Sequence, residues 1–172
     1  MKLQTAIISI VAILILTGVF SWGYGRSGNQ VAGVSNVAQT SELSEAGLKA
    51  PKIFYDFGTI SMRDGNVEKD FTIINPTGAD IKLKTVSTSC MCTKAIIVRK
   101  DGSTKGPFGM PGMGFVPPAN EVVKAGESLV IRAVYDPNAH GPAGVGMIDR
   151  FINLVDESGN SIRLEIKALV KP

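Results

Sequence analysis

The sequence predicts an all-β protein, a two-sheet antiparallel β-sandwich of about seven strands. From residue 51 onward, apolar and polar residues alternate with a period of two, which is typical of strands buried on one face. Turn-forming residues separate the alternating segments at regular intervals, and no convincing amphipathic helix interrupts them. Strands of this length with short turns pack best as two stacked sheets.

The alternation is clearest in five segments, residues 53–57, 67–75, 81–85, 129–135 and 162–170. Between the segments lie short runs with strong turn propensity, because Gly, Asn, Asp and Pro suit the backbone angles of tight turns. These runs are Asp64-Gly65, Asn75-Pro76-Thr77-Gly78, Asp101-Gly102, Ala125-Gly126 and Ser158-Gly159-Asn160. Together the segments and turns predict a sandwich domain over residues 51–172.

An apolar segment at the N-terminus predicts a hydrophobic helix over residues 1–24. Its length falls between a signal-peptide core and a membrane-spanning helix. Trp22 and Tyr24 follow the apolar run directly and suit the lipid–water boundary, and no small-residue cleavage site stands next to it. The flanks therefore favour a retained single-pass anchor over a cleaved signal. We expect the C-terminal domain outside the cytoplasm at the cell membrane, or a secreted or periplasmic protein if the segment is cleaved.

Two further stretches lack periodicity. Residues 25–50 are rich in small and polar residues, and this composition predicts a flexible spacer. Residues 105–120 read KGPFGMPGMGFVPPAN, a Gly-, Pro- and Met-rich insertion through which we expect no strand to run. Connections of this length within a domain are often functional.

Charge and composition argue against two classes of function. The net charge is +3, and the basic residues are scattered singly, so we predict no nucleic-acid binding. The chain has one histidine, no nucleophile elbow, no paired carboxylates and no phosphate-binding loop followed by a helix. We therefore predict that the chain is not an enzyme and binds no catalytic cofactor.

Cys90 and Cys92 are the two cysteines of the chain, and three interpretations remain open. They are buried packing residues, ligands of one soft metal ion such as Cu(I) or Zn(II), or a redox-active pair. In extended backbone their Cα atoms would lie about 6.5–7 Å apart, near the upper limit for a disulfide, so such a bond would be strained and easily reduced.

Methionines near the cysteines favour Cu(I) if a metal is bound. Met110 and Met113 lie three residues apart in the insertion, and thioethers together with thiolates are the ligands that Cu(I) prefers. The hypothetical metal site therefore comprises Cys90, Cys92, Met110 and Met113. His140 lies in a Gly/Pro-rich loop, which is more typical of an exposed side chain than of a ligand.

The insertion also predicts a binding surface for a protein partner. It carries four large apolar side chains, and an exposed cluster of this kind usually marks an interface. The residues are Phe108, Met110, Met113 and Phe115. We therefore expect an exported or membrane-anchored binding or scaffolding module, with the soft-metal or thiol-redox site at Cys90 and Cys92 as the alternative.

Three sequence runs carry a family resemblance: FYDFGTI at residues 54–60, KDFTIINPTG at 69–78 and SCMCT at 89–93. They resemble the bacterial domain of unknown function 1573, which is related to the Hydin-like domains of ciliary proteins. The similarity covers residues 51 to about 135 closely and the last two strands more loosely; the family usually has Gly where Met91 stands. The resemblance implies an immunoglobulin-like sandwich in an exported protein and implies no particular activity.

Overall fold

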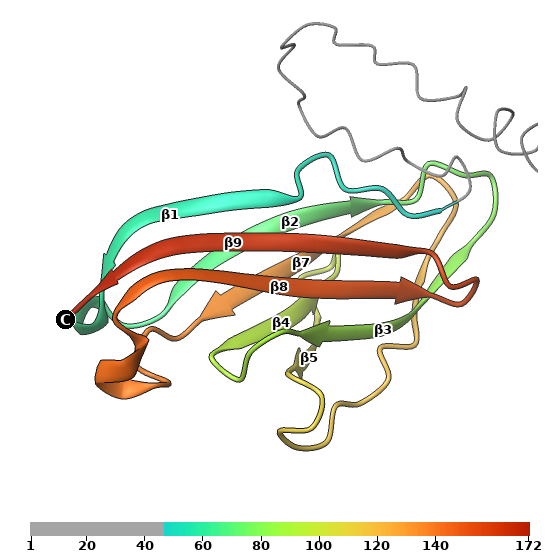
Figure 1. The fold of residues 1–172 in the computed structure, drawn as a ribbon. Helices are drawn as coiled ribbons and strands as arrows, with labels where there is room; N and C mark the ends of the chain where they lie inside the picture. Colours follow the sequence, from blue (N-terminus) through green and yellow to red (C-terminus); the bar gives the residue numbers. More distant parts are fainter. Residues whose placement is uncertain (1–46) are drawn as a thin grey trace, which may run out of the picture. The chain divides into compact units, whose positions relative to one another are not determined.

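A computed structural model describes residues 47–172, which form nine strands and two short 3-10 helices (Figure 1). The strands are β1 (Phe54–Ser61), β2 (Val67–Ile74), β3 (Ile81–Thr88), β4 (Thr93–Val98), β5 (Thr104–Phe108), β6 (Glu121–Val123), β7 (Ser128–Tyr135), β8 (Gly146–Asp156) and β9 (Ser161–Lys171); the helices are η1 (Met62–Asp64) and η2 (Gly141–Gly144). The predicted anchor, residues 1–24, and spacer residues 25–46 lie outside the described residues. Within residues 47–172, no helix is long and apolar enough to cross a membrane.

The strands form two sheets, which confirms the prediction of a mostly β, two-layered protein. One sheet has the order β1-β9-β8-β3-β6 and the other β2-β7-β4-β5. Every pairing between neighbouring strands is antiparallel except that of β1 with β9, which run parallel from Phe54 beside Glu165 to Ser61 beside Lys171. The prediction of a wholly antiparallel sandwich was therefore wrong at the edge strand β1. The chain crosses to the other sheet after β1, so β1 is free to lie along β9 in the same direction.

The core lies between the sheets and follows the predicted alternation along β7 and β9. Along β7 every second side chain is buried, and along β9 the same holds from Leu164 to Val170. In β3 an irregularity in the pairing with β8 falls between Leu83 and Thr85. This irregularity shifts the alternation of buried and exposed residues by one position, so that Val86 and Thr88 face the core in place of Thr85.

The strand β5 corrects the prediction that no strand enters residues 105–120. Gly106 has φ 119° and its peptide bond to Pro107 is cis, and both are accommodated because β5 lies at the edge of its sheet. A Cβ atom at Gly106 would lie 3.1 Å from the carbonyl oxygen of Ala95 on β4. The irregular connection is therefore residues 109–120, called the β5–β6 loop below, which extends away from the sheets in Figure 1.

The strand count also differs, nine against about seven, because β5 and β6 are short edge strands of five and three residues with little alternation. The domain begins earlier than residue 51 as well. Lys49 exchanges two backbone hydrogen bonds of 2.7 Å with Ile74, and Leu48 and Ala50 pack against the core. The last residues of the predicted spacer therefore belong to the folded domain.

Candidate functional site

The two cysteines lie in the tight turn that joins β3 to β4. The backbone N–H of Thr93 donates to the carbonyl oxygen of Cys90 at 3.1 Å, and the Thr88 hydroxyl lies 3.0 Å from the same oxygen. This turn replaces the extended backbone that the sequence suggested. It brings the Cα atoms of Cys90 and Cys92 to 5.2 Å, within the usual range for disulfides, and the two sulfurs are bonded.

The two cysteine residues differ in burial. Cys92 is 2% exposed, whereas Cys90 is half-buried and the intervening Met91 is exposed. Two neighbouring segments hold the turn in place. The N–H of Asp136 donates to the carbonyl oxygen of Cys92 at 2.9 Å, and the N–H of Ser89 donates to that of Phe151 at 3.0 Å. The turn therefore leaves the residue Cys90 partly accessible and keeps Cys92 inside the end of the sandwich.

An arginine contacts the buried sulfur. Arg150, on β8, donates from Nε to Sγ of Cys92 at 3.2 Å and from Nη1 to the carbonyl oxygen of Asp149 at 2.9 Å. Its charge also acts on Tyr135 nearby: burial raises the pKa of the phenol, and the positive charge of Arg150 opposes that rise. A permanent positive charge beside Cys92 would stabilise a thiolate there.

A histidine contacts the outer sulfur. Nε2 of His140, just before η2, lies 3.2 Å from Sγ of Cys90. The connection that carries it is fixed by the Asp136 carboxylate, which accepts from the N–H of Asn138 at 2.8 Å, and by the N–H of Gly141, which donates to the Asn138 carbonyl oxygen at 2.9 Å. The side chain is exposed, as expected, but it sits against the disulfide instead of standing alone.

Among the described residues, Sγ of Cys90, Sγ of Cys92 and Nε2 of His140 lie within 4.8 Å of one another. Reduction would turn this group into two thiols and one imidazole, a donor set that could hold a soft ion such as Cu(I) or Zn(II). The Cu(I) site therefore stays a prediction, and it would require the reduced protein. The structure adds His140 to the residues that the sequence suggested.

The four apolar residues predicted to bind a partner separate into two groups. Phe108 is completely buried at the end of β5, so its assignment to an exposed surface was wrong. Its side chain belongs to the core cluster between the sheets. Met110 is half-buried, whereas Met113 and Phe115 are 59% and 88% exposed. The carbonyl oxygen of Gly109 accepts from the N–H of Thr88 at 3.0 Å, so the loop leaves the domain close to the cysteine turn.

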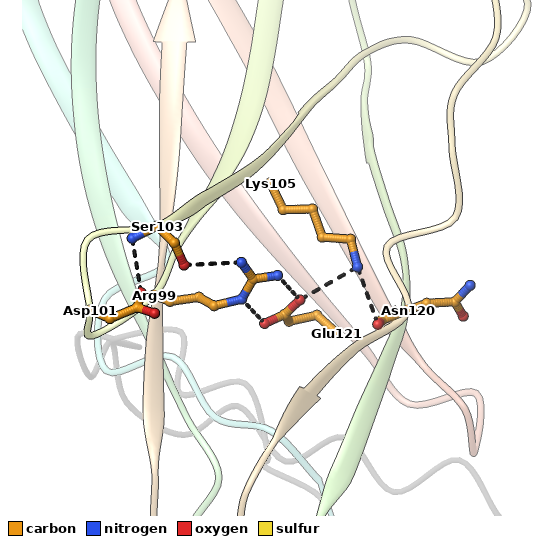
Figure 2. A network of polar contacts seen from close by, with 6 residues as sticks. All are labelled: Arg99, Asp101, Ser103, Lys105, Asn120 and Glu121. Atoms are coloured by element: carbon orange, nitrogen blue, oxygen red, sulfur yellow. Dashed lines mark hydrogen bonds and ion pairs between the residues drawn. The ribbon is translucent and has the colours of Figure 1, made fainter.

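The β5–β6 loop is closed at its base by a carboxylate that pairs with two basic side chains (Figure 2). Glu121 accepts hydrogen bonds from Nε and Nη2 of Arg99, the latter at 2.7 Å, and forms an ion pair of 3.5 Å with Lys105. Lys105 also donates to the carbonyl oxygen of Asn120 at 3.3 Å. These contacts join the start of β5 to the start of β6 and fix the C-terminal end of the loop, while the hydrogen bond of Gly109 with Thr88 fixes its N-terminal end.

Sequence reasoning did not identify Arg150 and set His140 aside. They lie 58 and 50 residues from the cysteines whose sulfurs they contact, on a different strand and a different connection. The chain has a single histidine, and that was the one signal available for it. No signal in the sequence distinguishes Arg150 from the other basic residues.

Comparisons with known proteins identify no family. No family model and no curated protein matches the sequence. Among solved structures, the chain is similar to a protein of unknown function from Porphyromonas gingivalis W83, with 18% identity and a TM-score of 0.51 over 71% of this chain and 46% of that one. It is also similar to the secreted serine protease VesC from Vibrio cholerae (14% identity, TM-score 0.45, 73% and 23% covered) and to the Pseudomonas aeruginosa CupB2 chaperone (14%, 0.38, 71% and 55%).

The chain therefore spans less than half of the length of the Porphyromonas gingivalis protein. The likeness to that protein concerns the fold alone, and the other two are too distant to carry an argument. What the geometry establishes is a β-sandwich with a disulfide, an imidazole and a guanidinium at one end, and an exposed apolar loop that leaves the domain beside them.

Proposed function

We propose that this chain is a non-enzymatic, extracytoplasmic binding module. In this proposal the N-terminal segment tethers an immunoglobulin-like domain of the domain of unknown function 1573 type to a cell membrane, and the domain captures a protein partner. The single observation that carries the proposal is the exposure of Phe115 and Met113 on the β5–β6 loop. A large aromatic side chain left almost wholly in water costs free energy that burial against a partner would recover.

The fixed base of the loop supports this function. Glu121, which follows the loop, pairs with Arg99 and Lys105, and Gly109 at the other end accepts a hydrogen bond from the N–H of Thr88, so both ends of the loop are held. A loop with fixed ends loses less conformational entropy on binding than a loop with free ends, so more of the gain from burying Phe115 contributes to affinity. Aromatic residues and methionine are also the types enriched at the centres of protein interfaces.

Site-specific photo-crosslinking of the full-length chain in cells tests the proposal. A photoreactive amino acid at position 115 is expected to give one discrete protein adduct, because the partner covers this side chain. The matched control is position 54, where Phe54 is also aromatic and 48% exposed but lies on β1. A Met113→Ser/Phe115→Ser variant should bring the yield of a crosslinker placed at position 112 down to background.

Two results would contradict the proposal. One is the same pattern of adducts at positions 115 and 54, which would indicate random encounters. The other is crosslinking at position 115 to lipid alone, which would make the loop a membrane contact. The circular dichroism spectrum of the double variant checks that its sandwich is intact.

A further inference from the structure

We propose that the Cys90–Cys92 disulfide is a thiol–disulfide exchange site that oxidises a dithiol of another protein. Cys90 is the sulfur that is attacked and Cys92 the sulfur that leaves, with Arg150 and His140 stabilising the two thiolates. The proposal goes beyond the binding function and does not depend on the β5–β6 loop. It rests on the two contacts made by the sulfurs, 3.2 Å from His140 Nε2 to Cys90 and 3.2 Å from Arg150 Nε to Cys92.

A purely structural role explains these features less well. A disulfide stabilises a fold mainly by restricting the unfolded chain, and the effect grows with the length of the loop that the bond closes. Cys90 and Cys92 are separated by one residue, so their bond closes almost the shortest loop that two cysteines can form. A structural bridge also has no need of a cation beside a buried sulfur.

The burial pattern assigns the two sulfurs their order of reaction. An incoming thiolate can approach Cys90, which is half-buried on an exposed turn beside Met91. It has no comparable access to Cys92, which is 2% exposed. The guanidinium of Arg150 and the hydroxyl of Thr93, 3.7 Å from Sγ, surround the atom on which negative charge would develop.

The reaction balances in two steps. A thiolate of the partner attacks Sγ of Cys90, the Cys90–Cys92 bond breaks, and its electron pair leaves on Sγ of Cys92. The partner's second thiolate then attacks the partner's first sulfur, which is bonded to Sγ of Cys90 in the mixed disulfide. This bond breaks, and its electron pair leaves on Sγ of Cys90. The partner dithiol loses two electrons and releases its two protons to solvent, and the cysteine pair gains the two electrons as two thiolates. Stabilised thiolates make this direction favourable, because they favour the reduced form of the pair.

Two single-cysteine variants of the full-length chain in detergent test the order of attack. Oxidised glutathione is the probe, and mass spectrometry follows formation of the mixed disulfide. Cys92→Ser leaves the accessible Cys90 and should be modified at least about tenfold faster than Cys90→Ser, which leaves the buried Cys92. Equal rates, or faster modification of Cys92, would overturn the proposal.

Redox equilibration with dithiothreitol at constant pH tests the roles of the Arg150 guanidinium and the His140 imidazole. We expect the equilibrium constant for reduction to fall about tenfold in Arg150→Gln, equivalent to about 30 mV, with recovery in Arg150→Lys. A smaller fall in the same direction is expected in His140→Gln, and no change in Lys124→Gln, which removes a charge in the turn after β6. Unchanged constants in both site variants, or reduction only in denaturant, would overturn the proposal. If Arg150→Gln fails to fold, the comparison of the modification rates of the two single-cysteine variants still tests the proposal.

Discussion

At the scale of single residues, buried polar side chains show how the turns are joined to the core. Asn75 begins the predicted Asn-Pro-Thr-Gly turn and is completely buried. Its Nδ2 donates to the carbonyl oxygens of Ala79 and Val123, both at 2.8 Å, and its Oδ1 accepts from the N–H of Thr77 at 3.0 Å. One amide therefore organises its own turn and joins it to β6, which lies 48 residues further along the chain.

Replacing this amide should be costly. We expect Asn75→Ala to lower the free energy of unfolding by about 2–4 kcal/mol, because it removes several hydrogen bonds and leaves buried partners unpaired. Asn138→Ala is the matched control, since its exposed side chain makes one hydrogen bond, to the carbonyl oxygen of Met62. Urea denaturation of both variants provides the measurement. A change at Asn75 no larger than that at Asn138 would contradict this account.

At the scale of elements, the β5–β6 loop depends on the charged contacts at its base. The hydrogen bond from Arg99 is the main cause that lowers the pKa of Glu121, and the charge of Lys105 acts in the same direction. A carboxylate whose pKa is lower in the folded than in the unfolded state stabilises the fold above the unfolded pKa of about 4.3. That stabilisation is lost as the pH falls through the lower, folded value.

We therefore expect Glu121→Gln to destabilise the domain by about 1–2 kcal/mol at pH 7, since the side chain is 10% exposed but its partner Arg99 is partly solvated. The difference from the parent should shrink as the pH falls from about 5 towards 3, because the parent loses the same interaction on protonation. Urea denaturation across this pH range measures both effects. Glu127→Gln, in a more exposed pair with Lys100, serves as the control. A difference independent of pH would show that the charge of Glu121 is unimportant.

At the scale of the whole molecule, the sandwich is held by its two sheets, and the disulfide lies at one end of them. The core residues with no exposure come from strands of both sheets, such as Ile73 and Ile131 in one and Ile152 and Leu164 in the other. This continuous apolar layer dominates the free energy of folding. We therefore expect the fold to persist when the Cys90–Cys92 disulfide is reduced.

Reduction should leave the domain folded. We expect dithiothreitol to lower the free energy of unfolding by less than about 2 kcal/mol, because the bond closes so short a loop. Urea denaturation with and without the reductant, together with a count of free thiols, provides the measurement. A loss of the cooperative transition on reduction would instead identify the disulfide as a structural brace.

The sequence by itself determined the all-β class, most of the strands and several turns. Alternation with a period of two reports which face of a strand is buried, and this information is local, so the patterns in β7 and β9 were read correctly. The same local reasoning failed at β5, where it predicted an irregular insertion. An edge position in a sheet tolerates Gly106 and Pro107, and position in a sheet is not encoded in local alternation.

Only the tertiary structure decided how the sheets are ordered and what surrounds the cysteines. The parallel pairing of β1 with β9 joins segments as distant in sequence as Phe54 and Glu165, and it depends on which strands cover each other's apolar faces. In the same way, His140 and Arg150 come from different parts of the chain and meet the two sulfurs because β7, β8 and the cysteine turn reach the same end of the sandwich. Sequence spacing reports contacts within an element, whereas a site assembled from two connections and a strand is set by the packing of the whole domain.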